Sequence, residues 1–258
     1  MTYAGKYLYC IIRGPGEHIF DDIAPIGNTN NPVHTISHNG LAVVVSDSAD
    51  RDYETSRARM LAHERVQERV MRDFPLLPVR FGTVTRDFAS AMPDLNQLLE
   101  TRSHEFDHLL AEMEGKVELG LKALWRDEKA LFEEIVAENL AIRRFRNSVE
   151  GKPPQAIHFE KIHLGQMVKD ALDRKRRLEA THLLAPLRSL AHSVKENEVI
   201  LDRMVFNVAF LMDQAMEREM DEAVKRLSDE WENRIELKYT GPNPPWNFVE
   251  IVVNWGAP

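Results

Sequence analysis

The chain has 258 residues, of which 43% are hydrophobic and 29% charged, and its formal net charge is −8. This composition is typical of a folded protein and excludes extensive disorder, while the acidic balance disfavours nucleic-acid binding as a main role. The single cysteine, Cys10, excludes an intrachain disulfide, and the sequence nowhere contains the long apolar run that a membrane-spanning helix needs. We therefore expect a soluble, cytoplasmic protein, and the length suggests two domains.

The first 92 residues predict a small mixed α/β domain. Its expected elements, in chain order, are strands at 7–12, 33–37 and 40–45, a helix over 56–72, and an edge strand or extended loop over 74–84. The second and third strands are expected to pair through a tight turn at Asn39-Gly40, because Asn-Gly supplies the positive φ angles that hairpin turns need.

The rest of the chain predicts a linking helix at 93–114, a second domain at 115–240 and a C-terminal extension at 241–258. The expected elements are a strand at 117–125, a helix from Asp127 that Gly151-Lys152-Pro153-Pro154 ends, a helix over 159–185 with Leu178 facing inward, strands near 194–199 and 204–211, a helix from Asp213, and a strand at 235–239. Pro242, Pro244 and Pro245 are expected to exclude regular structure before an apolar piece at 248–253, which would cover the sheet or an edge.

The predicted fold class is α+β with two domains. Counted from Gly115, the order strand, helical crossover, strand, strand, helix, strand is that of the ferredoxin-like, or split βαβ, fold. The crossover is unusually long because it contains two helices. We therefore predict an N-terminal α+β domain at 1–92 and a C-terminal ferredoxin-like domain with an elaborated helical crossover.

One segment matches a catalytic motif. His104, Glu105 and His108 have the H-E-x-x-H spacing, in which two histidines one helical turn apart bind zinc and the glutamate is the general base. However, at 100° per residue both histidines lie about 160° from Phe106, which marks the apolar face of the predicted helix. They are therefore expected to face solvent. A catalytic zinc also needs a third protein ligand, for which Glu128 is the only obvious later acid.

Two further polar groups have simpler interpretations as parts of the fold. His63 lacks a second histidine four residues later, so it is expected to be a hydrogen-bond partner on the helix surface or between domains. The run Arg174-Lys175-Arg176-Arg177 lies among acidic residues, which favours a solvated, partly paired helix face over a phosphate site. We therefore expect no catalytic residue, no cofactor and no metal site, and no enzymatic activity.

Several segments carry a family resemblance. They include the opening strand 7–12, the strand 40–46, and three more specific blocks: L-P-V-R-F-G-T at 77–83, G-K-V-E-L at 115–119, and G-P-N-P-P-W-N-F at 241–248. In this order, and over nearly the whole chain, they resemble the GvpF/GvpL family of gas vesicle proteins. Trp246 stands where a tyrosine is often found in that family, which preserves an aromatic side chain.

The resemblance implies a minor structural or accessory gas vesicle protein. Such a protein would bind the small, very hydrophobic shell protein GvpA and other accessory proteins during vesicle nucleation and assembly, and could keep shell subunits from aggregating. The resemblance also implies a ferredoxin-like C-terminal domain, and it supplies no catalytic residues. We expect a cytoplasmic protein associated with the gas vesicle, with neither nucleic acid nor a lipid membrane as a partner.

Two proline-fixed apolar segments, 76–83 and 241–248, are the candidate anchors for a partner surface or for an interdomain contact. The candidate residues are Leu77, Pro78, Arg80, Phe81, Pro245, Trp246 and Phe248. Simple packing of domain against domain would produce the same pattern, and the sequence leaves both interpretations open.

Two alternative functions belong to other classes. The first is a zinc-dependent hydrolase that uses His104, Glu105 and His108. The second is a ligand-binding regulatory module, because ferredoxin-like domains host many unrelated functions.

Overall fold

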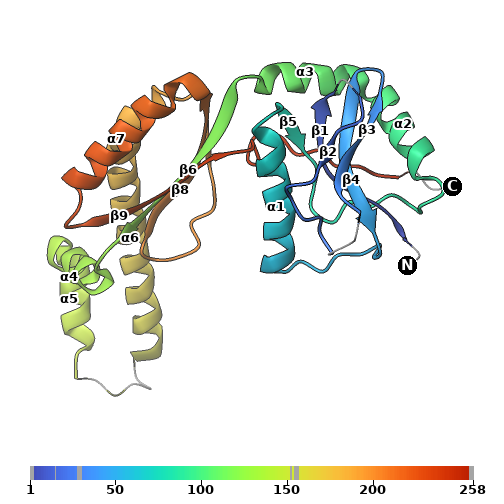
Figure 1. The fold of residues 1–258 in the computed structure, drawn as a ribbon. Helices are drawn as coiled ribbons and strands as arrows, with labels where there is room; N and C mark the ends of the chain where they lie inside the picture. The colour runs from blue at the N-terminus through green and yellow to red at the C-terminus, as the bar shows by residue number, and fades with distance from the viewer. Residues whose placement is uncertain (1–2, 15, 28–30, 152, 154–156, 256–258) are drawn as a thin grey trace. The chain divides into compact units, whose positions relative to one another are not determined.

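The computed structural model describes residues 3–14, 16–27, 31–151, 153 and 157–255. Within them the fold is α+β, with two antiparallel sheets and seven α-helices (Figure 1). The chain divides into two compact units: Met1–Glu118 with Pro242–Pro258, called the first unit, and Leu119–Gly241, called the second unit. The predicted linking helix and most of the C-terminal extension fall within the first unit.

A five-stranded sheet of order β2-β3-β4-β1-β5 forms the centre of the first unit. Its strands are β1 (Gly5–Arg13), β2 (Ile19–Phe20), β3 (Val33–His38), β4 (Leu41–Ser48) and β5 (Leu76–Pro78). All of β4 is buried, so both faces of the sheet are covered. The edge position predicted for the proline-containing segment is confirmed by β5, whose only neighbour in the strand order is β1.

The predicted hairpin is confirmed. In the β3–β4 pair, His38 lies opposite Leu41, which leaves Asn39 and Gly40 as a two-residue turn. Their φ angles are 50° and 84°. Two successive positive φ values match the right-handed twist of the flanking strands, and Asn and Gly tolerate them best.

Three helices complete the first unit: α1 (Arg57–Met71), α2 (Ala91–Thr101) and α3 (Ser103–Met113). Ser56 caps α1, where its hydroxyl accepts from the Arg59 N–H at 3.3 Å. The prediction of one continuous helix over 93–114 is wrong, because the chain leaves helical geometry at Arg102 (φ −110°, ψ 15°). The Thr101 hydroxyl donates to the carbonyl of Gln97 at 2.7 Å, a bond that often bends helices.

The C-terminal segment lies along the β5 edge of this sheet. Val79 and Ile251 form a parallel bridge, in which the Ile251 N–H donates to the Pro78 carbonyl at 2.8 Å. The Arg80 N–H donates in turn to the Ile251 carbonyl at 3.0 Å. The expectation that the final apolar piece covers an edge is therefore confirmed.

A four-stranded sheet of order β7-β8-β6-β9 forms the centre of the second unit. Its strands are β6 (Lys116–Trp125), β7 (Ser193–Glu196), β8 (Met204–Asp213) and β9 (Ile235–Asn243). The last strand was expected to end at Tyr239, but β9 includes Pro242. A strand at the edge of a sheet tolerates proline because its outward side needs no backbone donor.

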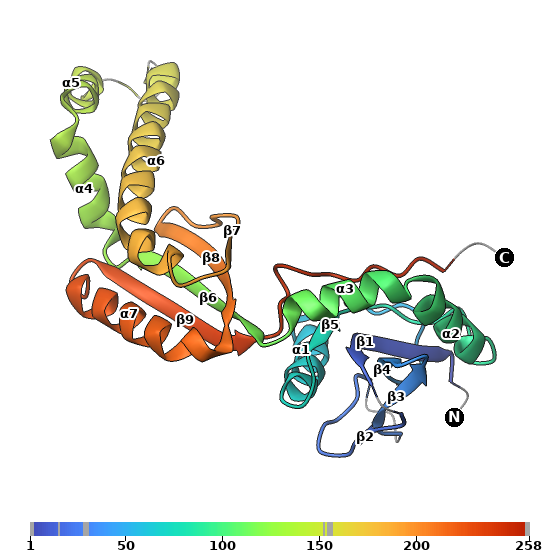
Figure 2. The ribbon, with the colours of Figure 1, turned by 90° about the horizontal axis from the view of Figure 1, so that it is seen from above.

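The helices of the second unit form the long crossover between β6 and β7 and a later return to β9. They are α4 (Glu128–Glu138), α5 (Leu140–Val149), α6 (His158–Arg188), the short 3₁₀ helix η2 (Gln214–Met216) and α7 (Glu217–Glu230). Figure 2 shows α4 and α5 beside α6. Within the described residues, no helix combines the length and apolar character that spanning a bilayer requires.

Three sequence predictions for these helices need correction or fall outside the structure. The helix from Asp127 ends at Glu138, because Asn139 leaves helical geometry and its side chain donates to the Ile135 carbonyl at 2.7 Å. Leu178 is exposed rather than inward-facing. Of the predicted helix breaker at 151–154, Lys152 and Pro154 lie outside the described residues.

An ionic network joins the helices of the second unit to its sheet. Buried Glu179 of α6 accepts from the Trp125 indole at 2.6 Å and pairs with Arg234 at 2.6 Å. Arg234 also pairs with Glu134 of α4 at 2.9 Å, and Glu134 pairs with Lys175 at 2.7 Å. Burial alone would raise the pKa of Glu134, but hydrogen bonds from Lys175 and Arg234 outweigh it and lower the pKa. These charges are stable inside the unit because each has a partner.

Candidate functional site

The H-E-x-x-H segment lies on the exposed side of α3. His104, Glu105 and His108 are all exposed, which confirms the predicted orientation of the two histidines. Arg102 holds both oxygens of Glu105, at 2.6 and 2.7 Å, and these hydrogen bonds lower the pKa of that carboxyl. His108 lies 3.5 Å from Glu112 on its own helix. Among the described residues, no three His, Cys, Asp or Glu side chains gather where they could hold a metal ion.

A buried polar network lies between α1 and the sheet of the first unit. His63 is buried, so its expected place on the helix surface is wrong, but its expected role as a hydrogen-bond partner is confirmed. Its Nδ1 lies 3.0 Å from the Tyr7 hydroxyl, and its Nε2 lies 3.1 Å from the Val79 carbonyl and 2.9 Å from the Gln67 amide nitrogen. The Tyr7 hydroxyl also accepts from the Gly82 N–H at 3.0 Å.

The imidazole of His63 is held in its neutral form. Burial lowers its pKa from 6.5 to about 4, although the hydrogen bond to the Val79 carbonyl opposes the shift. Because Nε2 donates to the Val79 carbonyl, Nδ1 of the neutral ring is free to accept from the Tyr7 hydroxyl. The histidine therefore acts as a neutral connector between α1 and the segment after β5.

Gln67 links the same network to the C-terminal segment. Its amide nitrogen donates to the Tyr9 carbonyl at 2.6 Å, and its amide oxygen accepts from the Trp246 indole at 2.6 Å. Because an indole N–H can only donate, it fixes which end of the Gln67 amide faces it. One glutamine side chain thus joins β1, α1 and the chain after β9.

The candidate anchors occupy these two neighbouring segments of the first unit. Leu77, Pro78 and Pro245 are buried, Trp246 is partly buried, and each has its neighbours within the unit. Gly82, with a φ of 81°, allows the sharp turn that brings its N–H to Tyr7. The segments 76–83 and 244–251 therefore form one packed and hydrogen-bonded assembly.

Besides Trp246, three of the anchor residues remain at least partly accessible. Arg80 is exposed and pairs with Glu250 at 2.7 Å, where both side chains are about half exposed. Phe81 and Phe248 are partly buried. Because the Trp246 indole is already bound to Gln67, these three side chains are the part of the predicted set that is free to contact a partner.

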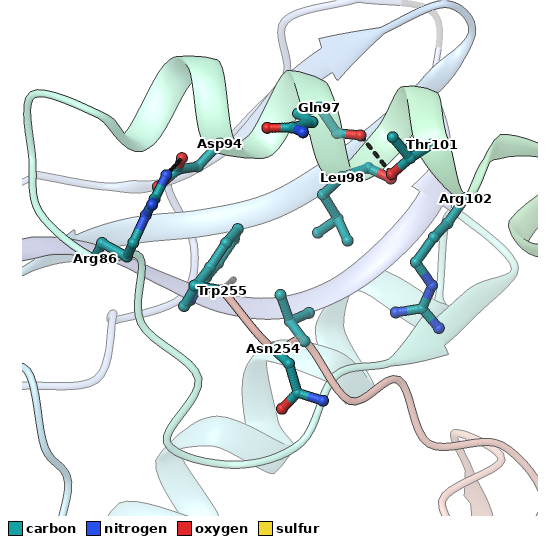
Figure 3. A pocket seen from close by; sticks show the side chains of 9 residues that line it. Arg86, Asp94, Gln97, Leu98, Thr101, Arg102, Asn254 and Trp255 are labelled. Atoms are coloured by element: carbon teal, nitrogen blue, oxygen red, sulfur yellow. Dashed lines mark hydrogen bonds and ion pairs between the residues drawn. The ribbon is translucent and has the colours of Figure 1, made fainter. Parts of the chain in front are cut away.

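A pocket of about 210 Å³ lies between α2 and the C-terminal segment (Figure 3). Figure 3 shows Arg86 reaching Asp94 at one end, with Arg102 at the other end. The Trp255 indole donates to the Val84 carbonyl at 2.6 Å and fixes one wall. The hydrogen bonds from Arg86 lower the pKa of Asp94 even though this carboxylate is buried. The charged groups of this pocket therefore already have partners within the chain.

The basic run at 174–177 lies on α6 and is partly paired, as predicted. Lys175 pairs with Glu134 at 2.7 Å, and Arg176 pairs with Asp173. Hydrogen bonding to Glu134 and Glu138 raises the pKa of Lys175 against the opposing effect of burial. The lysine is thus committed to the ionic network of the second unit.

Sequence reasoning missed Gln67 and Glu179 as connecting residues. Each is a polar residue within an amphipathic helix, where the pattern predicts exposure. The signal in the sequence was the presence of tryptophans, whose indole N–H groups need acceptors. In the structure, Trp246 donates to Gln67 and Trp125 donates to Glu179. Neither indole can remain buried without an acceptor, but the sequence does not indicate which acceptor it finds.

Comparison with known proteins gives full-length matches. The model of the family described as gas vesicle synthesis protein GvpL/GvpF matches residues 5–250. The chain is 27% identical over 251 residues to gas vesicle protein F of Microcystis aeruginosa, covering 96% of this chain and 99% of that protein. It is 25% identical over 262 residues to gas vesicle protein L1 of Halobacterium salinarum, covering 95% and 90%.

The structural comparison agrees. The crystal structure of the gas vesicle protein GvpF from Anabaena sp. PCC7120 matches with a TM-score of 0.78 at 26% identity, covering 96% of this chain and 99% of that one. The crystal structure of GvpF from Microcystis aeruginosa matches with a TM-score of 0.77, also at 26% identity, covering 95% and 98%. The whole chain, rather than one unit, therefore shares this fold.

Proposed function

The chain belongs to the gas vesicle synthesis protein GvpL/GvpF family, and from this membership we propose that it binds the shell protein GvpA during vesicle nucleation and assembly. Membership gives it a role in gas vesicle formation, within a structural and accessory family that is not known for catalysis. The observation that carries the proposal is the match over residues 5–250, which includes both compact units.

The proposed action is temporary cover for an aggregation-prone subunit. A very hydrophobic shell protein exposes apolar surface and strand edges before assembly, and both promote aggregation. Large apolar side chains that this chain leaves exposed, among them Phe159, Ile162 and Ile200, support an apolar contact of this kind. Other accessory gas vesicle proteins are further proposed partners, and the proposed location is the cytoplasm, in association with the vesicle.

Co-expression with GvpA tests the proposal. An affinity-tagged version of the whole chain should retain GvpA on the resin and increase the fraction of GvpA that stays in the supernatant after centrifugation. An unrelated acidic protein with the same tag is the control. If the tagged chain retains no more GvpA than the control protein does, the proposed function is wrong.

We also propose that the accessible anchors, Arg80, Phe81 and Phe248, contribute to the partner surface. Arg80→Ala should weaken GvpA retention while changing the free energy of unfolding by less than about 0.5 kcal/mol, because its ion pair is exposed. Arg13→Ala is a matched control, since Arg13 and Asp107 form an ion pair of similar exposure in the same unit. If Arg80→Ala and Arg13→Ala retain equal amounts of GvpA, the anchors only pack within the first unit.

We further propose that the two compact units are the two domains, and that the second is ferredoxin-like. Its strands and helices follow one another as strand, helices, strand, strand, helix, strand, and its sheet has the order β7-β8-β6-β9. Limited proteolysis of the whole chain tests the boundaries. Early cleavage within the five-stranded sheet or within β8, rather than near residues 118 and 242 at the ends of β6 and β9, would contradict them.

A further inference from the structure

A groove of about 510 Å³ lies within the second unit, between the C-terminal half of α6 and the strands β7 and β8. Apolar side chains lining it include Ala180 and Leu184 of α6 and Val205 and Val208 of β8. We call it the α6 groove. Its volume falls within the range of ordinary ligand pockets.

The groove is elongated along α6. Its lining residues on this helix recur from Arg176 to Arg188 at intervals that place them on one helical face. Twelve residue steps at 1.5 Å each correspond to about 18 Å, or roughly three helical turns. A groove of that length and apolar character matches the side of a peptide helix better than it matches a compact small molecule.

Both ends of the groove are fixed by hydrogen bonds and ion pairs. At one end, the guanidinium of Arg176 donates to the carbonyls of Met204 at 2.8 Å and Asp202 at 3.0 Å. At the other end, Arg188 pairs with Glu196 of β7. The walls are therefore held in place before any partner arrives, which lowers the entropy cost of binding.

The backbone beside β8 is already occupied. The Asn197 N–H donates to the Asn207 carbonyl at 2.7 Å, and the Met204 N–H donates to the Leu201 carbonyl at 3.0 Å. In addition, β8 lies between β7 and β6 in the sheet, so its backbone leaves no free edge for an added strand. The groove therefore offers side-chain contacts rather than a free strand edge, which again favours a helix as its occupant.

The charge at the rim specifies the occupant further. Arg177 lines the groove, and within the described part of the chain it forms no ion pair, unlike Arg176 and Arg188. Leu178 and Ile200 directly follow the lining residues Arg177 and Val199 in the sequence and are 64% and 69% exposed, and Leu201 is 47% exposed. In a chain of net charge −8, this rim combines an uncompensated cation with accessible apolar side chains.

We propose that the α6 groove docks an amphipathic helix of the shell protein, with the apolar face of that helix in the groove and an acidic side chain opposite Arg177. The proposal rests on the proposed function, because it names a second surface, besides the accessible anchors, through which this chain would hold GvpA. The apolar contacts supply affinity, and the acidic side chain sets the direction in which the helix lies.

Two groove variants with matched controls test the proposal in the full-length chain. Arg177→Glu reverses the rim charge, and its control is Arg174→Glu, an exposed position on α6 that does not line the groove. Ala185→Trp fills the groove from an exposed helical position, and its control is Ala141→Trp on the exposed side of α5. Circular dichroism and melting temperature establish that all four variants fold.

Binding of purified GvpA, measured by biolayer interferometry, should separate the two pairs. Arg177→Glu should weaken binding by about tenfold, mainly through slower association, and should reduce the salt dependence of the association rate. Ala185→Trp should weaken binding by a similar factor through faster dissociation. Both controls should bind as the unmodified chain does.

The other outcomes overturn the proposal in distinguishable ways. If the unmodified chain binds GvpA and the groove variants bind equally well, the groove assignment fails and the proposed function stands. If the unmodified chain does not bind GvpA, both fail. If light scattering shows a dimer of this chain that Arg177→Glu dissociates, a second copy occupies the groove and the assignment is wrong.

Discussion

Around His63, the first unit buries a neutral set of polar side chains, whereas the second unit joins its helices to its sheet through an ionic set. Tyr7, His63 and Gln67 connect the segments of the first unit through hydrogen bonds between uncharged groups. Glu179 and Arg234 connect the second unit through opposite charges. The stability that a neutral network provides depends little on salt and requires each donor to have an acceptor. An ionic network destabilises the fold strongly when one charge loses its partner.

The largest effect is expected from removing the cation of the ionic set. Arg234→Met leaves Glu179 buried beside an apolar side chain, and we expect it to lower the free energy of unfolding by about 3 kcal/mol. Urea unfolding followed by circular dichroism measures the change. The second unit contains Trp125 and Trp231, so the fluorescence of a variant that keeps only these two tryptophans would show whether the loss is confined there.

The matched control removes both charges. Adding Glu179→Gln to Arg234→Met keeps an acceptor for the Trp125 indole but leaves no unpaired carboxylate. The double variant should recover more than half of the lost stability. If it is as unstable as the single variant, packing of the Arg234 side chain rather than charge pairing holds the unit together.

Acid should weaken the first unit in a separate pH window. Burial lowers the pKa of His63 from 6.5 to about 4, so between those values the unfolded chain binds more protons than the folded chain. The contribution is fully present above pH 6.5 and declines as the pH falls, by a total of about 3 kcal/mol at pH 4. The lowered pKa of Glu134 acts in the same direction but only in the range where carboxylates titrate.

A substitution at the same position isolates this effect. His63→Gln keeps hydrogen-bonding capacity and cannot titrate, so its free energy of unfolding should vary less between pH 6.5 and pH 4 than that of the unmodified chain. Urea unfolding at half-unit pH steps measures the two slopes. Parallel slopes would show that another group controls stability in this window.

The sequence predicted those parts of the fold whose cause is local. Asn39-Gly40 specifies its hairpin turn, and Asp127 caps the helix that follows it. The two helix breaks at Arg102 and Asn139 were not predicted, because the apolar pattern continues across each of them. They depend on side chains bonding to backbone carbonyls, which periodicity does not reveal.

The burial of α6 and the anchor assembly depend on partners far away in the chain. Periodicity placed Leu178 inward, whereas its neighbour Glu179 is the buried residue because Trp125 and Arg234 provide partners for its carboxylate. The segments 76–83 and 241–248 were identified as candidate anchors from their prolines and apolar residues. Their contact through Gln67, 179 residues before Trp246, could not be derived from local patterns.

The smallest effect is expected at Trp246, where the neutral network meets the C-terminal segment. Trp246→Phe keeps an aromatic ring but removes the donor to Gln67, and we expect a loss of about 1–2 kcal/mol because the amide oxygen keeps no indole partner. Trp255→Phe is the control. It also removes one indole hydrogen bond, but the acceptor of that bond is the backbone carbonyl of Val84 rather than a side chain. Thermal unfolding should show the larger shift for Trp246→Phe. Equal shifts in melting temperature would mean that the Gln67 amide oxygen finds another donor. The neutral network would then tolerate the loss of one hydrogen bond better than the ionic network tolerates the loss of one charge.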